Sequence, residues 1–332
     1  MSLLDTFEAR QIEAEVRISQ LRQSLKGKLD ALPQDDRFPS LTIYATGSLA
    51  RKEANSESDL DAFFMLSSNH TTHPMGRIRD VRVLNAVLDS AEETNFPDFS
   101  NDGEYLKFLH IDHVIEHLGD REDDYINAFT ARMLMLLEST YLYNEDKFNE
   151  FRNKIIDVYF TDFHRHSDSF RPIFLLNDVI RFWRTLCLNY ENGRHWRMRQ
   201  EEGEVAKGHL QNLKLKFSRL SICYSFICHL LSQGPALAIE SVIKTASLTP
   251  FERLAEIADR VPECTPIILE MREEYAWFLD ATSRPKDVTL DWILNQANRD
   301  DAFSHAGRFV NATVNLTTIV ANKHDYLRYL IV

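Results

Sequence analysis

Cysteine is scarce in this chain, and the few cysteines present form no recognisable pattern. No C-x-x-C pair occurs, and most of the cysteines stand in apolar, helical-looking surroundings. A zinc site and a disulfide framework are therefore not expected, and the thiols should be reduced. The four cysteines are Cys187, Cys223, Cys228 and Cys264.

Long apolar runs and a secretion signal are also lacking. A transmembrane helix needs about 18 or more consecutive apolar residues, and no such run occurs. No leader-like segment stands at the N-terminus, and no internal repeat or low-complexity tract is visible. The sequence therefore predicts a cytoplasmic protein with no membrane contact.

Positive charge is in deficit. Lys and Arg number 38 against 50 Asp and Glu, which gives a net charge of −12. This balance argues against a large non-specific nucleic-acid surface, although a local basic site is compatible with it. The remaining composition is that of an ordinary globular protein, and 332 residues suffice for two domains with sizeable cores.

The most informative stretch runs from Leu41 to Leu66. Alternating Leu41, Ile43 and Ala45 predict a strand, Gly47-Ser48 breaks it, and the apolar run 62–66 predicts a second strand. Two carboxylates stand at the start of that second strand. The stretch therefore reads as strand, tight turn, connector and strand.

This layout suits phosphate and metal chemistry. Side chains two positions apart on a strand share a face, so Asp59 and Asp61 can aim at one point while Leu60 faces a core. Two such carboxylates suit Mg²⁺, which takes its other ligands from substrate phosphates. Gly47 lets the backbone approach a phosphate closely, and Ser48 can donate its hydroxyl and its N–H.

The same residues resemble a known family. The pattern G-S-x-A-R-x-E-x(4)-S-D-L-D is similar to the signature of the DNA polymerase beta-like nucleotidyltransferases, and most similar to the bacterial branch related to the uridylyltransferase of nitrogen-regulatory proteins. It is carried by Gly47, Ser48, Arg51, Glu53, Ser58, Asp59, Leu60 and Asp61. The resemblance covers about 30 residues.

The resemblance implies transfer of a nucleoside monophosphate from an NTP such as ATP, with Mg²⁺ or Mn²⁺ as cofactor. Asp59 and Asp61 would be catalytic and hold the metal, and Gly47 and Ser48 would hold the triphosphate. The hydroxyl acceptor is open: a protein side chain, a small molecule, a tRNA end or a second nucleotide. The acidic charge disfavours RNA, and Ala50-Arg51 departs from the Gly-Thr pair of nucleotide-joining synthases. Arg51 and Glu53 are expected to brace the turn by pairing.

Family members usually carry a third carboxylate on a later strand, where it helps to deprotonate the acceptor or shares the second metal. Glu104 is the first candidate, because it begins a predicted strand over 104–109. Asp102 and Asp112 are the alternatives, and Asp112 would be better placed if that strand extends through His110.

A competing motif follows in the segment His113-Val114-Ile115-Glu116-His117, which matches the H-x-x-E-H helix of inverted zinc proteases. Five residues are a weak match, and no paired downstream glutamate motif accompanies them. An amphipathic helix from 112 to 118 is the simpler interpretation.

The overall expectation is an α+β protein with two domains. Residues 1–145 would form a small mixed-sheet nucleotidyltransferase domain, with an N-terminal helix over 3–32 packed on the sheet. Residues 146–332 would form an all-helical domain, with the active site in the cleft between the two.

The helical domain offers further candidates. The most basic segment is 194–219, and Lys214, Lys216 and Arg219 are candidate triphosphate ligands, with an ordinary solvated face as the alternative. A helix over 169–190 carries polar residues that either face a cleft or lie on the solvated side: Asn177, Asp178, Arg181 and Arg184.

Several local features complete the sequence-based interpretation. Thr249-Pro250 and Thr265-Pro266 predict helix starts. Arg132 is expected to pair with a nearby acid, with a place near the active site as the alternative. The apolar tail 325–332 would dock on the core or on a second subunit of a homo-oligomer. A catalytically weak nucleotide-sensing or partner-binding module with the same fold is the alternative function.

Overall fold

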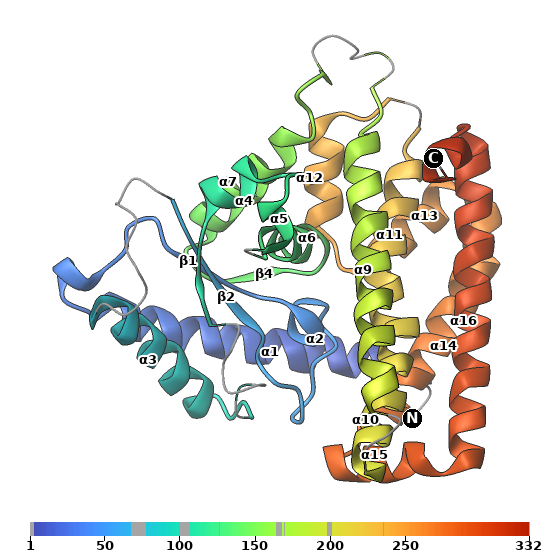
Figure 1. Cartoon of the computed structure of the whole chain (residues 1–332), viewed down its shortest axis with the longest axis horizontal. Coiled ribbons are helices and arrows are strands. Elements are labelled where there is room, and N and C mark those ends of the chain that lie inside the picture. The colour runs from blue at the N-terminus through green and yellow to red at the C-terminus, as the bar shows by residue number, and fades with distance from the viewer. Residues whose placement is uncertain are drawn as a thin grey trace. The chain divides into compact units, whose positions relative to one another are not determined.

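A computed structural model of the chain describes residues 3–67, 78–97, 99, 106–125, 127–163, 168, 170–197, 201–234 and 236–331 (Figure 1). The chain divides into two compact units. The sheet unit is Ala9–Val158, and the helical unit is Met1–Glu8 together with Tyr159–Val332. All four strands lie in the sheet unit, whereas every regular element described in the helical unit is a helix. The predicted combination of a small mixed sheet with many helices is confirmed.

The sheet has the strand order β3-β2-β1-β4. Strand β1 (Thr42–Ala45) pairs antiparallel with β2 (Ala62–Leu66), with Ala45 opposite Ala62, and antiparallel with β4 (Thr140–Tyr143). Strand β3 (Phe108–His110) runs parallel to β2, with Phe108 beside Phe64. Because β1 and β2 are antiparallel, the end of β1 and the beginning of β2 meet at the same edge of the sheet.

Helix α1 (Leu3–Asp30) covers one face of the sheet together with α3 (Ile78–Glu93). Within the sheet unit, the apolar stripe Ala14, Ile18, Leu21 and Leu25 is buried in one cluster with strand residues such as Ile43. The three- and four-residue spacing of this stripe puts it on one side of the helix. The predicted packing of the N-terminal helix on the sheet is confirmed.

The opposite face of the sheet is covered by aromatic packing. Tyr44 of β1 stacks on Phe63 with 5.5 Å between ring centroids, and it contacts Phe148 of α7 (Glu145–Val158) at 5.9 Å. Because α7 packs on β1 and β4, it belongs to the sheet unit. The division of the chain therefore falls after Val158 rather than near residue 145.

Short helices follow β3. They are α4 (Ile111–Glu116), α5 (Glu122–Tyr125) and α6 (Ala128–Leu137). Arg132 of α6 donates to both carboxylate oxygens of Asp123, at 2.9 and 2.8 Å, and to the carbonyl oxygen of Val114 at 3.0 Å. The side chains of Arg132 and Asp123 are fully buried. The expected pairing of Arg132 with an acid is confirmed, and the pair joins α5 to α6.

The helical unit contains long helices connected by short turns. Helix α13 begins with the predicted capping box, in which Thr249 and Glu252 bond reciprocally, and α14 begins at Thr265 as predicted. The elements are α9 (Ile173–Arg197), α10 (Glu202–Lys214), the π-helical turn η3 (Leu215–Arg219), α11 (Leu220–Ser232), α12 (Ile239–Ser247), α13 (Pro250–Arg260), the 3₁₀ turn η4 (Pro262–Cys264), α14 (Thr265–Ala281), α15 (Lys286–Leu294), α16 (Gln296–Lys323) and α17 (Leu327–Ile331).

Two segments at the ends of the chain join the helical core. Phe7 at the start of α1 packs against Phe251 and Tyr275, with centroid distances of 4.8 and 6.5 Å. Tyr326 is fully buried, and its hydroxyl donates to the carbonyl oxygen of Gly234 at 2.9 Å. The C-terminal segment thus docks on the core of its own chain.

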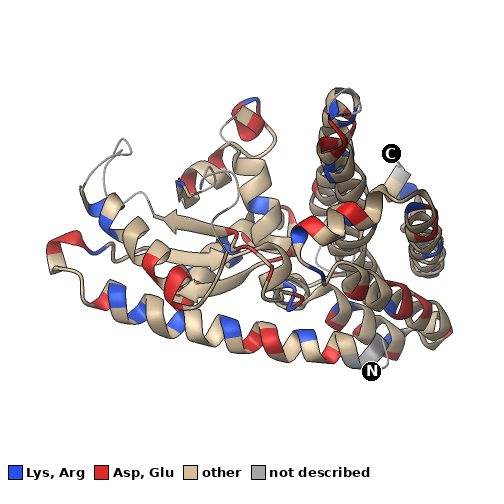
Figure 2. Ribbon diagram, turned by 90° about the horizontal axis from the view of Figure 1, so that it is seen from below, with Lys and Arg blue, Asp and Glu red and all other residues tan. Residues whose placement is uncertain are grey.

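Charged residues of both signs alternate along α1 (Figure 2). Such mixing is typical of a solvated helix face. Among the helices that the structure describes, none has the length and apolar character to cross a membrane.

Candidate active site

The turn after β1 is built around Gly47. Thr46 is extended, Gly47 has a φ of +70°, and the short helix α2 (Gly47–Ala50) follows. A methyl group placed on Gly47 would lie 2.8 Å from Oδ2 of Asp61, which is far inside van der Waals contact. Glycine is therefore required both by the backbone conformation and by the close approach of the Asp61 carboxylate.

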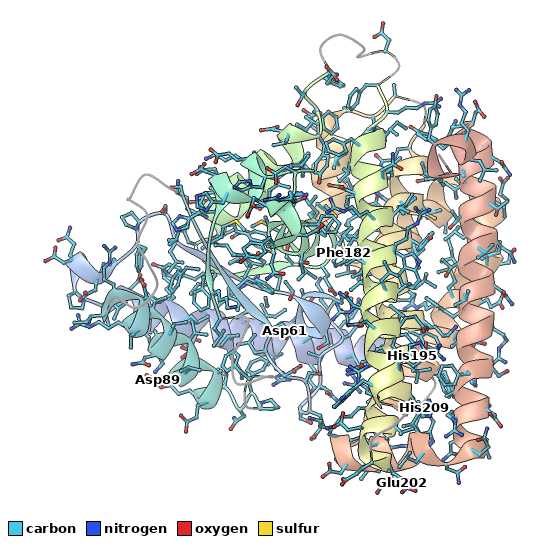
Figure 3. All side chains as sticks on the ribbon, viewed as in Figure 1. Asp61, Asp89, Phe182, His195, Glu202 and His209 are labelled. Carbon is cyan, nitrogen blue, oxygen red and sulfur yellow. The ribbon has the colours of Figure 1, made fainter. Side chains whose placement is uncertain are left out.

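Asp61 stands at the entrance of β2, directly opposite this turn. The N–H of Thr46 donates to the carbonyl oxygen of Asp61 at 2.9 Å, which extends the β1–β2 pairing one step beyond Ala45 and Ala62. The backbone thus holds the Gly-Ser turn and the second aspartate together, and Figure 3 labels Asp61 in this region. The two parts of the sequence motif are brought into contact.

Asp59 and Asp61 are both half-buried, and Leu60 between them is 1% exposed and belongs to the core cluster under α1. This alternation confirms the expectation that Leu60 faces the core. Carboxylates on the side of an extended chain away from Leu60 would offer hard oxygen ligands that converge with phosphate oxygens on a Mg²⁺ ion.

A network of buried ion pairs stabilises the turn. Nε of Arg51 lies 2.8 Å from Oε2 of Glu53, and Nη1 of Arg51 pairs with Glu138 at the end of α6. The three side chains are 7%, 3% and 0% exposed. Arg51 and Glu53 therefore brace the turn by pairing, as expected, and Glu138 is a partner that the sequence did not single out.

The connector between the turn and Asp59 is shaped by Ser58. Its hydroxyl accepts from the N–H of Asn55 at 3.0 Å and donates to Oδ1 of the same residue at 2.9 Å. The carbonyl oxygen of Asn55 accepts a hydrogen bond from Arg17 of α1. The serine of the motif thus has a structural role in this turn.

Arg17 is a residue that sequence reasoning missed. It is 8% exposed, its guanidinium lies 3.9 Å from the ring centre of Phe96, and its Nη2 is buried without a hydrogen-bond partner among the described residues. Burial lowers its pKa. The available signal was its position in the apolar stripe of α1, three residues after Ala14 and one before Ile18.

Of the three candidates for the third carboxylate, the structure describes Asp112. Glu104 and Asp102 lie outside the described residues. Asp112 is in the first turn of α4, after the C-terminal end of β3, whereas Asp59 and Asp61 precede β2. Because β2 and β3 are parallel, Asp112 lies at the opposite end of this strand pair from the two aspartates. The condition that would favour Asp112, its place on an extension of this strand, is not met, since β3 ends at His110 and Asp112 lies in α4.

The H-x-x-E-H segment forms α4 and the residue after it. The ring centroids of His113 and His117 are 6.3 Å apart. Nδ1 of His117 lies 3.0 Å from Oδ2 of Asp120. In the part of the chain that the structure describes, no three His, Cys, Asp or Glu side chains are grouped so as to hold a metal ion. The segment is helical, with Ile111 and Val114 buried on one side, as the amphipathic-helix interpretation predicted.

Lys214, Lys216 and Arg219 belong to the helical unit. Lys214 ends α10 and is exposed, while Lys216 and Arg219 lie in η3 and are half-buried. Burial raises the pKa of the Cys187 thiol on α9, and the nearby charge of Lys216 opposes this shift. Residues three apart on an α-helix are neighbours, but Lys216 and Arg219 lie in a π-helical turn, which changes their relative directions.

The polar residues of α9 do line a cavity. Asn177, Asp178, Arg181 and Arg184 face a space of about 420 Å³ that is closed on one side by Leu330 of α17. Asp178 accepts a hydrogen bond from the hydroxyl of Tyr159 at 2.7 Å and lies 3.7 Å from Nη1 of Arg181. Of the two alternatives for these residues, the structure bears out the cavity.

No protein-family model matches this chain, and a search of curated proteins finds no similar sequence. The chemistry must therefore be argued from the site itself.

Proposed function

We propose that this chain is a metal-dependent nucleotidyltransferase that transfers NMP from an NTP to a hydroxyl acceptor. The observation that supports the proposal is the contact between Gly47 and Asp61, because the Gly-Ser turn, which we propose binds phosphate, lies against a carboxylate at the start of β2. The carboxylates of Asp59 and Asp61 are suitable ligands for Mg²⁺ or Mn²⁺. Gly47 has no side chain, so the space beside its Cα stays open to the Asp61 carboxylate, whereas any other residue would fill that space.

In the proposed reaction, an acceptor hydroxyl oxygen forms a bond to the α-phosphorus of the NTP. The bond from that phosphorus to the bridging oxygen breaks, and pyrophosphate leaves with the electron pair. A bound Mg²⁺ ion would supply positive charge to the attacking oxygen and the leaving group. Asp59 and Asp61 would hold it, and Glu104, which lies outside the described residues, keeps the proposed role of accepting the acceptor's proton.

Ser48 and the backbone around Gly47 would bind the triphosphate. The Ser48 hydroxyl can donate to a phosphate oxygen, and a turn without a side chain lets backbone N–H groups reach it. Lys214, Lys216 and Arg219 remain proposed ligands of the outer phosphates. A protein or a small molecule is the proposed acceptor class, because the net charge of −12 disfavours RNA.

The test is transfer of label from each α-labelled NTP to a component of a cell lysate, with Mg²⁺. Asp59→Asn and Asp61→Asn should each lower transfer by about a hundredfold or more, because they remove a metal-binding charge while keeping the side-chain shape. Glu57→Gln is the matched control, since Glu57 is an exposed acid of the same loop, and it should leave transfer unchanged.

Transfer that survives both aspartate variants would overturn the assigned site. Tight NTP binding without transfer would instead support the alternative function, a nucleotide-sensing or partner-binding module. If the protein shows no NTP binding and no transfer, the interpretation of the Gly-Ser turn and its aspartates is overturned.

A further inference from the structure

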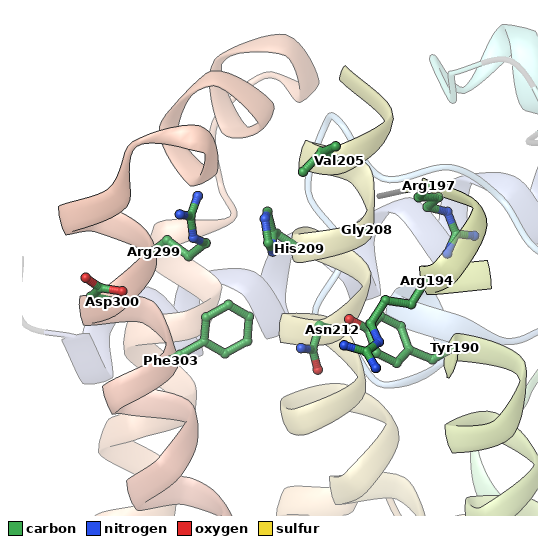
Figure 4. A pocket seen from close by; sticks show the side chains of 10 residues that line it. All are labelled: Tyr190, Arg194, Arg197, Val205, Gly208, His209, Asn212, Arg299, Asp300 and Phe303. Carbon is green, nitrogen blue, oxygen red and sulfur yellow. The ribbon is translucent and has the colours of Figure 1, made fainter. Parts of the chain in front are cut away.

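A second cavity lies in the helical unit, far along the chain from the nucleotidyltransferase motif. Its volume is about 270 Å³. Three helices line it: α10 lies centrally, with α9 on one side and α16 on the other (Figure 4). None of the residues assigned to nucleotide transfer lines this cavity.

The charge of the lining is strongly positive. Arg194 and Arg197 come from α9, and Arg299 comes from α16. One carboxylate is present, Asp300, and its Oδ1 accepts a hydrogen bond from Gln296 at 2.6 Å. Arg194 is also paired with Glu191 of the same helix, at 2.8 Å, whereas Arg197 and Arg299 add positive charge that favours an anionic ligand in a chain with a net charge of −12.

Arg197 supplies the most specific observation. Its Nη1 is buried and has no hydrogen-bond partner among the described residues. The guanidinium lies across Gly193, so that a methyl group on Gly193 would be 2.4 Å from Nη1. A buried donor without a partner is unfavourable, and because the half-buried Arg197 lines the cavity, an anion bound there would offer acceptors to its guanidinium.

The remaining lining residues favour a ligand with an apolar part. Tyr190 and Phe303 present aromatic rings to the cavity, and Val205 adds an aliphatic surface. His209 and Asn212 of α10 lie between them. Burial lowers the pKa of His209, and the charge of Arg299 lowers it further.

We propose that this cavity binds a small phosphate monoester, with its phosphate on Arg197 and Arg194 and its apolar or aromatic group against Tyr190 and Phe303. Phosphate offers more acceptor oxygens than a carboxylate, and guanidinium groups bind it in bidentate fashion. The cavity size suits a small molecule. The inference is independent of the proposed transferase activity, since it rests on the helical unit alone.

Calorimetric titration of the full chain tests the proposal with three probes: phenyl phosphate, inorganic phosphate and phenol. Phenyl phosphate should bind at least about tenfold more tightly than inorganic phosphate, and phenol should give no measurable binding. No binding of phenyl phosphate would overturn the proposal. Equal affinity for the two phosphates would overturn the assignment of the aromatic residues and identify free phosphate as the source of the anion.

Two variants test the position of the site. Gly193→Ala should displace the Arg197 guanidinium, and Arg197→Gln removes its charge, so each should weaken phenyl phosphate at least about tenfold. Alanine favours a helix more than glycine does, so Gly193→Ala should keep the fold, which thermal unfolding checks.

Arg184→Gln is the matched control, because Arg184 lies on the same helix but lines the other cavity. It should leave the affinity unchanged. Loss of binding in Arg184→Gln, with unchanged affinity in Gly193→Ala and Arg197→Gln, would place the phosphate in the other cavity and overturn the proposal.

Discussion

Gly47 is fixed as glycine by its surroundings and not only by its turn. Its φ of +70° disfavours other residues, and the Asp61 carboxylate occupies the space of a side chain. The helical Gly27 lacks this double constraint. Gly27, in the exposed part of α1, has no atom within 4 Å of an added methyl group.

Gly47→Ala should therefore lower NMP transfer by about a hundredfold, because Asp61 must move away from its position, and strain of about 1–3 kcal/mol should reduce the stability of the sheet unit. Gly27→Ala is the matched control and should stabilise α1 by up to about 1 kcal/mol. Transfer rates and hydrogen exchange of the β1 amides measure the two effects. Full activity in Gly47→Ala would contradict the role of this turn.

The network of Arg51, Glu53 and Glu138 makes a stability prediction. Arg51→Gln leaves two buried carboxylates without their cation, so the sheet unit should lose about 3–5 kcal/mol. Glu138→Gln should be milder, because Arg51 keeps its contact with Glu53. Hydrogen exchange of β1 and β2 measures both variants, and a larger loss in Glu138→Gln would contradict the assignment of Arg51 as the shared cation.

At the scale of elements, α1 contributes to both units through different side chains. Phe7 is 5% exposed and packs on Phe251 and Tyr275, whereas Val16 is 50% exposed. The helix is thus secured at its start by aromatic contacts of the helical unit and further along by the core of the sheet unit.

Phe7→Ala should destabilise the helical unit by about 3–5 kcal/mol, which is typical of a buried phenylalanine truncation. Val16→Ala on the same helix should change stability by less than about 0.5 kcal/mol. Urea unfolding followed by far-UV circular dichroism, which records helix in both units, is the measurement. Equal effects of the two variants would show that the packing of Phe7 contributes no stability.

The sequence predicted the elements that have strong periodicity or strong punctuation. The buried stripe of α1, the break at Gly47 and the cap at Thr249 are all local signals, and each is confirmed. Strand β4 was not recognised as a strand, because four residues carry too little alternation. Two further features depend on tertiary packing, which cannot be recognised from local sequence patterns. They are the place of α7 in the sheet unit and the π-helical turn η3.

The candidate site likewise contains residues that local sequence signals predicted and residues that they did not. Asp59, Asp61 and Gly47 were found because their spacing is a motif, and Arg51 and Glu53 belong to the same motif. Glu138 was missed, since its link to Arg51 spans 87 positions. The basic cavity was missed because Arg197 and Arg299 come together only when α9 and α16 pack around α10.

At the scale of the whole molecule, the tryptophans separate the two units spectroscopically. Trp183, Trp196, Trp277 and Trp292 all lie in the helical unit, and the sheet unit has none. Intrinsic tryptophan fluorescence therefore reports the unfolding of the helical unit. It can be compared with hydrogen exchange in the strands to show whether the two units unfold together.

The helical unit should lose stability in mild acid through His229. This side chain is fully buried, with Nδ1 at 2.8 Å from the hydroxyl oxygen of Thr245 and Nε2 at 2.9 Å from Nη1 of Arg260 and 3.1 Å from Glu256. Burial lowers the pKa of His229 to about 4, against 6.5 in the unfolded chain. Between these values the unfolded chain binds more protons, so stability falls as the pH falls from 6.5 to 4.

Wild type should be roughly 2 kcal/mol less stable at pH 5 than at pH 7 through this group, and His229→Gln should lack that part of the loss. His195→Gln is the control, because His195 is exposed, and it should behave as wild type. Urea unfolding followed by tryptophan fluorescence at both pH values measures the difference. An unchanged pH dependence in His229→Gln would contradict a neutral buried histidine.

The contact between Gly47 and Asp61 also bears on the order in which the protein forms during synthesis. The two residues are 14 positions apart and meet when a single hairpin closes, so little chain entropy opposes their contact. All residues of the sheet unit leave the ribosome before Tyr159. We therefore expect the turn at Gly47 to be assembled on the nascent chain while the helical unit is still being translated.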